Sequence, residues 1–218
     1  MKLFLLIPWL LFSALHMQQK KKVIFFGDSI TELGVRPGGY IRDLDSLQQK
    51  AGLNYEIEGA GIGGNKVYDL YLRMQEDVLD KKPDVVVIWI GVNDVWHKRL
   101  LGTGTDADKF QKFYQAIIRK MQDQKIKVIL CTPAVIGEKK DMTNELDGDL
   151  NKYAAIIRQL AVNNNCGLVD LRKAFLEKLQ QSNPDNKDRG VLTNDGVHLN
   201  LAGNLFVAES ILEKLKTQ

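Results

Sequence analysis

Short runs of apolar residues recur along this chain and define its predicted strands. The clearest are 85–90, Val-Val-Val-Ile-Trp-Ile, and 23–26, which are unbroken, and the runs 126–131 and 168–171 are apolar except for Lys127 and Asp170. Because these runs do not alternate with polar residues, each is typical of a strand buried on both faces of a sheet. A shorter segment, 55–58, completes a set of five predicted strands.

Helical segments separate the predicted strands. Their ends carry typical stop signals, such as Gly52 after the first helix and Pro83 after the second. Strands that alternate with helices predict an α/β fold, in which a parallel sheet is covered on both faces and joined by right-handed crossovers. Four of the expected helices span 67–80, 106–124, 144–164 and 201–215. Two more are expected to end near residues 50 and 181.

Two segments interrupt this pattern just after predicted strands. Residues 59–65, Gly-Ala-Gly-Ile-Gly-Gly-Asn, are too rich in glycine for us to expect regular structure, and residues 91–94, Gly-Val-Asn-Asp, end the central apolar run. A phosphate or dinucleotide cradle is the alternative for 59–65. The segment does not follow the first strand, and it lacks both the Gly-Lys-Ser/Thr ending and the G-x-G-x-x-G spacing that such a cradle needs.

The composition is that of a globular protein without a strong charge preference. The chain has 218 residues, 44% of them hydrophobic, and 30 basic against 27 acidic residues give a net charge of +3. This length suffices for one domain with a full core, predicted to span 23–218. A balance this even gives no indication of a nucleic-acid partner.

Residues 1–22 differ from the rest of the chain. Met1-Lys2 precedes an apolar stretch, 3–15, and Lys20-Lys21-Lys22 forms a basic linker. The stretch is too short for a comfortable membrane span and has the length of a signal-peptide core, so we expect export to a periplasm or the cell exterior and no stable membrane span. An uncleaved anchor or a mis-assigned start is the alternative, because no clean small-x-small cleavage site follows.

Two cysteines, Cys131 and Cys166, leave room for one disulfide in an exported chain. One ends a predicted strand and the other precedes the next, so in a parallel sheet they lie at opposite ends, roughly 10 Å or more apart. A disulfide needs Cα atoms within about 7 Å of each other. We therefore predict two free, mostly buried thiols.

Polar residues with catalytic potential follow the first and third strands. Ser29 comes directly after Gly27-Asp28, and Asn93 follows Gly91. The carboxyl ends of parallel strands share one crevice, which is where open α/β sheets place their sites. The alternative for Asp28 and Ser29 is that they only cap the next helix.

Near the C-terminus, Asp195-Gly196-Val197-His198 offers a candidate general base. A carboxylate three residues before a histidine can accept its Nδ1 proton, which fixes the tautomer and directs Nε2 outward. The alternative is that Asp195 and Asn200 begin a helix and that His198 is structural.

Taken together, four motifs resemble those of the SGNH hydrolases, the superfamily of GDSL-type esterases and lipases. They are Gly27-Asp28-Ser29-Ile30, the loop around Gly64, Gly91-Val92-Asn93-Asp94 and Asp195-Gly196-Val197-His198, in the family's order and spacing. The resemblance covers the chain from about residue 23 to the end. It implies a flavodoxin-like, three-layer α/β/α sandwich around a five-stranded parallel sheet.

The resemblance also implies a role for each matching residue. Ser29 would be the nucleophile, His198 its general base and Asp195 the residue that orients the histidine. The backbone N–H groups of Ser29 and Gly64, with the side-chain amide of Asn93, would form the oxyanion hole. One departure is Gly59, where relatives often have Asn before the glycine loop, but it removes none of these residues.

Further residues next to these motifs are candidates for substrate binding: Asp28, Asp94, Trp96 and His97. For Asp94 a structural role in its loop is the preferred interpretation. No Cys/His/Asp cluster has the spacing of metal ligands, so we expect neither a metal nor another cofactor.

The function predicted from this constellation is that of a serine esterase acting through an acyl-enzyme. We expect a small-molecule or carbohydrate ester as substrate, with a short acyl group such as acetyl. A lysophospholipase or thioesterase is the enzymatic alternative, and a carbohydrate- or lipid-binding module on the same fold is the non-enzymatic one. A flavin or nucleotide binder rests on fold analogy alone.

Overall fold

The computed structural model describes residues 20–217, so the predicted signal peptide lies almost wholly outside the described residues. The basic linker was predicted to include residues up to Lys22. In the structure, strand β1 (Lys21–Gly27) already begins at Lys21. The backbone N–H of Lys22 donates to Asp84 Oδ2 at 2.7 Å, and its ammonium lies 2.9 Å from a Glu58 carboxylate oxygen. These bonds extend the strand beyond its apolar run.

The five predicted strands form one parallel sheet, in the order β2-β1-β3-β4-β5. The chain adds β2 on one side of β1 and the later strands on the other side, so the direction in which strands are added reverses at β1. In such sheets, ligand sites lie outside the carboxyl ends of the strands near this reversal. The strands after β1 are β2 (Tyr55–Gly61), β3 (Val85–Trp89), β4 (Lys127–Cys131) and β5 (Gly167–Val169).

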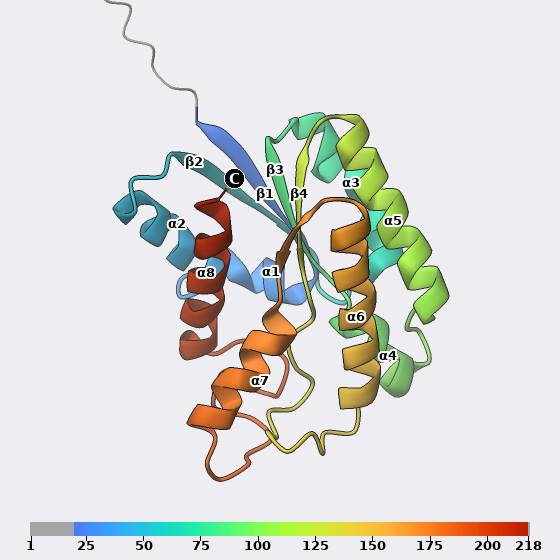
Figure 1. Ribbon diagram of the computed structural model, residues 1–218, viewed down its shortest axis with the longest axis vertical. Helices are drawn as coiled ribbons and strands as arrows, with labels where there is room; N and C mark the ends of the chain where they lie inside the picture. Colours follow the sequence, from blue (N-terminus) through green and yellow to red (C-terminus); the bar gives the residue numbers. More distant parts are fainter. Residues whose placement is uncertain (1–19, 218) are drawn as a thin grey trace, which may run out of the picture.

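Helices cover both faces of the sheet and give the predicted three-layer sandwich (Figure 1). Alternate strand residues face opposite layers: Val23 and Phe25 join one core cluster, and Ile24 and Phe26 join the other. Three helices pack on the first face: α2 (Tyr40–Lys50), α7 (Leu171–Ser182) and α8 (Leu201–Leu215). On the second face lie α3 (Val67–Asp77), α5 (Ala107–Asp123) and α6 (Asp147–Asn163).

The glycine segment is more regular than predicted, because β2 continues through Gly61. A Cβ on Gly61 would lie 2.1 Å from the backbone nitrogen of Glu32, and one on Gly59 would lie 2.3 Å from Val35 Cγ1. The glycines therefore let the short helix α1 (Ser29–Gly34) and the turn after it pack directly on the strand.

Two further differences concern helices. Residues 92–101 form helix α4 (Val92–Leu101), where we expected irregular structure around Asn93 and Asp94. The helix is bounded by Gly91 (φ 125°) and Gly102 (φ 68°), two glycines that mark its ends in the sequence. The expected helix 67–80 ends at Asp77 and continues as a 3₁₀ turn, η1 (Leu79–Lys81).

The cysteine prediction is confirmed. Cys131 is buried and Cys166 is partly exposed, and both are free thiols. Between residues 20 and 217, no helix is long and apolar enough to cross a bilayer.

Candidate active site

Ser29 lies at the turn between β1 and α1. Gly27 ends the strand, and a Cβ there would lie 2.5 Å from the carbonyl oxygen of Trp89 on β3, so the neighbouring strand leaves no room for a side chain. Asp28 is the N-cap of α1, and its carboxylate accepts a hydrogen bond from the N–H of Ile30 at 3.0 Å. The capping alternative is thus correct for Asp28, whereas Ser29 is the first helical residue and its hydroxyl stays available.

That hydroxyl meets the predicted histidine. Ser29 Oγ lies 3.0 Å from His198 Nε2, although the two residues are 169 positions apart. His198 Nδ1 lies 2.7 Å from Asp195 Oδ2. With Nδ1–H donated to the carboxylate, Nε2 is free to accept the serine proton, which is the arrangement that a serine nucleophile requires.

Asp195 is held as an anion in a fixed orientation. Its Oδ1 accepts hydrogen bonds from the N–H groups of Val197 (2.9 Å) and His198 (2.7 Å). Partial burial raises the pKa of Asp195, but the hydrogen bonds from His198 and Val197 outweigh it and leave the pKa below its ordinary value. The carboxylate is therefore ionised at neutral pH. Asp195 does not start the next helix, which is capped by Asn200.

A buried carboxylate that the sequence did not reveal holds the start of this loop. Glu138 is fully buried, and its two oxygens accept hydrogen bonds, each 2.7 Å long, from the N–H groups of Val191, Leu192 and Thr193. The preceding N–H, of Gly137, donates to the carbonyl oxygen of Gly196 at 2.8 Å. Residues 137 and 138 thus fix the loop that carries Asp195 and His198. A lone Glu in a polar connection gives no sequence signal for this role.

The glycine loop carries Gly64, the second predicted backbone donor. Gly64 has φ of 75°, a conformation that favours glycine, and the N–H of Gly63 donates to Glu32 Oε2 at 2.6 Å. Asn93 is buried in the first turn of α4, and its Nδ2 donates to the backbone oxygen of Asn65 at 3.1 Å. An amide nitrogen has two hydrogens, so one remains for a ligand. The structure therefore brings Asn93 next to the Gly64 loop.

Two of the predicted substrate-binding residues are buried and accept hydrogen bonds from backbone N–H groups. Asp28 and Asp94 are 2% and 0% exposed. Asp94 accepts from the N–H of Val67 at 3.2 Å, which fits its preferred structural role, and a part for either carboxyl in substrate binding stays a prediction. Burial raises the pKa of each carboxyl to about 7, and for Asp28 the nearby Asp94 adds to the increase.

Trp96 and His97, by contrast, lie beside the predicted site. The Trp96 ring centroid is 6.3 Å from that of His198 and 5.7 Å from that of His97. A Cβ on Gly64 would lie 3.8 Å from His97 Cε1. Burial, with the charge of Lys66, lowers the pKa of His97, so its imidazole is neutral at pH 7. Both side chains are partly exposed, and their role in substrate binding stays a prediction.

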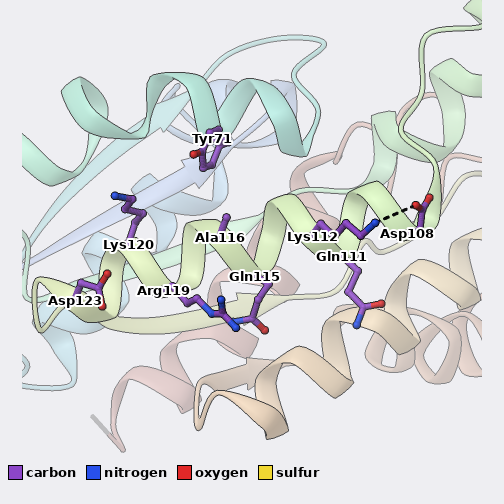
Figure 2. A pocket seen from close by; sticks show the side chains of 9 residues that line it. All are labelled: Tyr71, Asp108, Gln111, Lys112, Gln115, Ala116, Arg119, Lys120 and Asp123. Carbon is purple, nitrogen blue, oxygen red and sulfur yellow. Dashed lines mark ion pairs between the residues drawn. The ribbon is translucent and has the colours of Figure 1, made fainter.

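A separate groove lies on the outer surface of α5, with Tyr71 of α3 on its other side (Figure 2). None of the site residues named above contributes to it. Across residues 20–217, no three His, Cys, Asp or Glu side chains are grouped so that they could hold a metal ion.

Comparison with known proteins gives concordant matches. Residues 25–205 match the model of the GDSL-like Lipase/Acylhydrolase family. An acetylxylan esterase of Geobacillus stearothermophilus is 32% identical over 214 residues, which cover 89% of this chain and 94% of that protein. An uncharacterized lipoprotein of Bacillus subtilis strain 168, YqeF, is 29% identical and covers 97% of both chains. The crystal structure of an acetyl xylan esterase, AlAXEase, is 64% identical with a TM-score of 0.86, covering 88% of this chain and 98% of that one.

Proposed function

Because this chain belongs to the GDSL-like lipase/acylhydrolase family and is a carboxylic ester hydrolase, we propose that Ser29 is its nucleophile and that its substrates are acetyl esters of carbohydrates. The observation that carries the assignment of Ser29 is the hydrogen-bonded series of Ser29 Oγ, His198 and Asp195, with distances of 3.0 and 2.7 Å. Within this series the serine hydroxyl is the group that has a general base within hydrogen-bond distance.

Acylation begins when His198 Nε2 removes the proton of Ser29 as Oγ attacks the ester carbonyl. The imidazolium that forms is stabilised by the Asp195 carboxylate, which its hydrogen bonds keep ionised. His198 then donates its proton to the departing alcohol oxygen, and an acetyl-serine remains. In the second half, His198 activates a water molecule that attacks this ester and releases acetate.

The oxyanion of both tetrahedral intermediates is bound, in this proposal, by the N–H groups of Ser29 and Gly64 and by Asn93 Nδ2. Two of these donors belong to the backbone, and the third is held by its bond to Asn65. Donors that are fixed before the reaction need no reorganisation as charge develops, which makes them effective catalysts.

The carbohydrate part of the proposal rests on likeness and on exposure. A protein that is 64% identical over most of both chains is an acetyl xylan esterase. The His198 and Asp195 side chains are 26% and 46% exposed, so the site is open to solvent. An open site can accept an ester on a bulky polysaccharide, whereas a long acyl chain would need an enclosed apolar channel.

A substrate panel tests this function. We expect wild-type protein to release acetate from acetylated xylan and to prefer p-nitrophenyl acetate to esters of eight or more carbons. Replacing Ser29→Ala should abolish both activities while leaving the circular dichroism spectrum unchanged. A preference for long acyl chains or for lysophospholipid would overturn the substrate assignment, and an active Ser29→Ala variant would overturn the nucleophile.

We also propose that the domain starts at about residue 21 and that the preceding residues direct export. Their composition supports this, as does similarity to a protein described as a lipoprotein. Expression of the full chain in a bacterium, followed by fractionation and N-terminal sequencing, tests it. Mature protein that begins between residues 14 and 22 outside the cytoplasm is the expected result, and an intact cytoplasmic chain contradicts it.

A further inference from the structure

Arg73 of α3 reaches the carboxyl ends of two neighbouring strands with a single guanidinium group. Its Nη2 donates to the carbonyl oxygen of Gly27, which ends β1, at 2.7 Å, and to that of Ala60 on β2 at 3.1 Å. Gly27 is two residues before Ser29, and Ala60 lies four residues before Gly64. One nitrogen therefore joins the backbone segments that supply both proposed N–H donors of the oxyanion hole.

The same side chain is connected to the third proposed donor. Arg73 Nε donates to Asn65 Oδ1 at 2.7 Å, and the backbone oxygen of Asn65 in turn accepts from Asn93 Nδ2 at 3.1 Å. Asn65 immediately follows Gly64. The guanidinium thus fixes the residue that orients the Asn93 amide.

The environment holds the guanidinium in place as a charged group. Its side chain is 16% exposed, it forms an ion pair with Asp77 one helical turn away, and its Cζ lies 4.5 Å from the centre of the Phe26 ring. A guanidinium presents its donors in a rigid, planar fork, and stacking on an aromatic face suits that plane. A lysine ammonium could keep the charge but could not make these bonds in their fixed directions.

We propose that Arg73 is a positioning residue that sets the geometry of the oxyanion hole. It does not touch the substrate. It acts through Gly27, Ala60 and Asn65, which hold the backbone of Ser29, the backbone of Gly64 and the amide of Asn93. The inference deepens the proposed function and rests on it, because a hole for an oxyanion matters only if Ser29 is acylated.

Kinetics of Arg73→Lys test the proposal, with Arg119→Lys as the matched control. Arg119 is an exposed arginine of α5, beside the groove of Figure 2 and remote from the bonds described here. Displacement of a catalytic group by a fraction of an ångström should lower kcat for p-nitrophenyl acetate by about 10- to 100-fold in Arg73→Lys, with KM changed by less than about threefold. The control should keep the wild-type kcat.

Any change at a partly buried arginine can lower stability, and this alone could reduce activity. The decisive readout is therefore a double-mutant cycle of kcat with Asn93→Ala. If Arg73 acts through the oxyanion hole, Arg73→Lys should lower kcat by a clearly smaller factor in the Asn93→Ala background than in wild-type protein, because one of the three donors that Arg73 positions is already gone. Multiplicative losses would show that the two residues act independently and would overturn the proposal.

Asn65→Ala provides a second route that leaves Arg73 intact and is the deciding variant if Arg73→Lys does not fold. It removes the acceptor of Arg73 Nε and should lower kcat by about tenfold. A wild-type kcat in folded Arg73→Lys or in Asn65→Ala refutes the inference, while an inactive Ser29→Ala in the same series leaves the proposed function standing. An active Ser29→Ala would instead refute the proposed function itself.

Discussion

Replacement of Glu138 by Gln probes how the loop carrying the catalytic base is held. Glu138 Oε1 accepts from the N–H groups of Leu192 and Thr193, and Oε2 accepts from the N–H of Val191. A Gln amide oxygen can replace only one of these acceptors, so an amide NH₂ must face a backbone N–H at the other. A buried hydrogen bond to a charged group contributes about 1.5–3 kcal/mol, and an unsatisfied donor costs about 1–3 kcal/mol.

From these values we expect Glu138→Gln to lower the free energy of unfolding by about 2.5–6 kcal/mol, measured by urea denaturation. The matched control is Glu145→Gln, whose side chain is 69% exposed in an ion pair with Arg99 and should change stability by no more than about 0.5 kcal/mol. The kcat of folded Glu138→Gln should also fall, by about tenfold, because His198 then has a looser support. Equal stability of the two variants would refute this account of the loop.

Three other predictions concern the site and the core. Asn93→Ala should lower kcat for p-nitrophenyl acetate by about 10²–10³ with little change in KM, and a wild-type kcat would remove Asn93 from the oxyanion hole. Burial raises the pKa of Asp28 from 3.8 to about 7, so the folded state keeps a proton that the unfolded state loses. The stability of wild-type protein relative to Asp28→Asn should therefore fall as the pH rises from about 4 to 7, and urea titrations in which the difference stays constant or increases would contradict this. Unfolded protein without reductant should show two thiols in a disulfide-exchange assay, from Cys131 and Cys166, and a count of zero would show that they are bridged. In the native state only Cys166 should react, and slowly, because partial burial raises its pKa to about 11.

The sheet and most helices could be predicted because their signals are local. An unbroken apolar run such as 85–90 fits only a strand that is covered on both faces, and the structure has β3 there. Helix α8 has the predicted bounds, Leu201–Leu215, because Asn200 caps it through the N–H of Gly203. Local propensity was sufficient at both places.

Local propensity was not sufficient where contacts with distant segments determine the backbone conformation. The strand conformation of Gly59 and Gly61 depends on the close approach of α1, and the helix at Asn93 is stabilised by the bond from Val67 to Asp94. Gly, Asn and Asp all favour turns, so single-sequence reasoning assigns such segments to loops.

The candidate site divides in the same way. Ser29 and His198 were found because each lies in a short motif, and the structure joins them across 169 positions. Arg73 and Glu138 lie in no motif, and their bonds to Gly27 and Val191 span 46 and 53 positions. Gly27 and Val191 take part through backbone groups, which every residue has, so the amino-acid sequence holds no mark of these two contacts.

The most direct test of the central claim, that Ser29 is the attacking group, is a covalent label. Wild-type protein treated with a fluorophosphonate should gain one adduct per chain, mapped by tandem mass spectrometry to Ser29, and the rate of labelling should fall steeply in His198→Ala. Stoichiometric labelling at another residue, or loss of esterase activity with Ser29 unmodified, would contradict it.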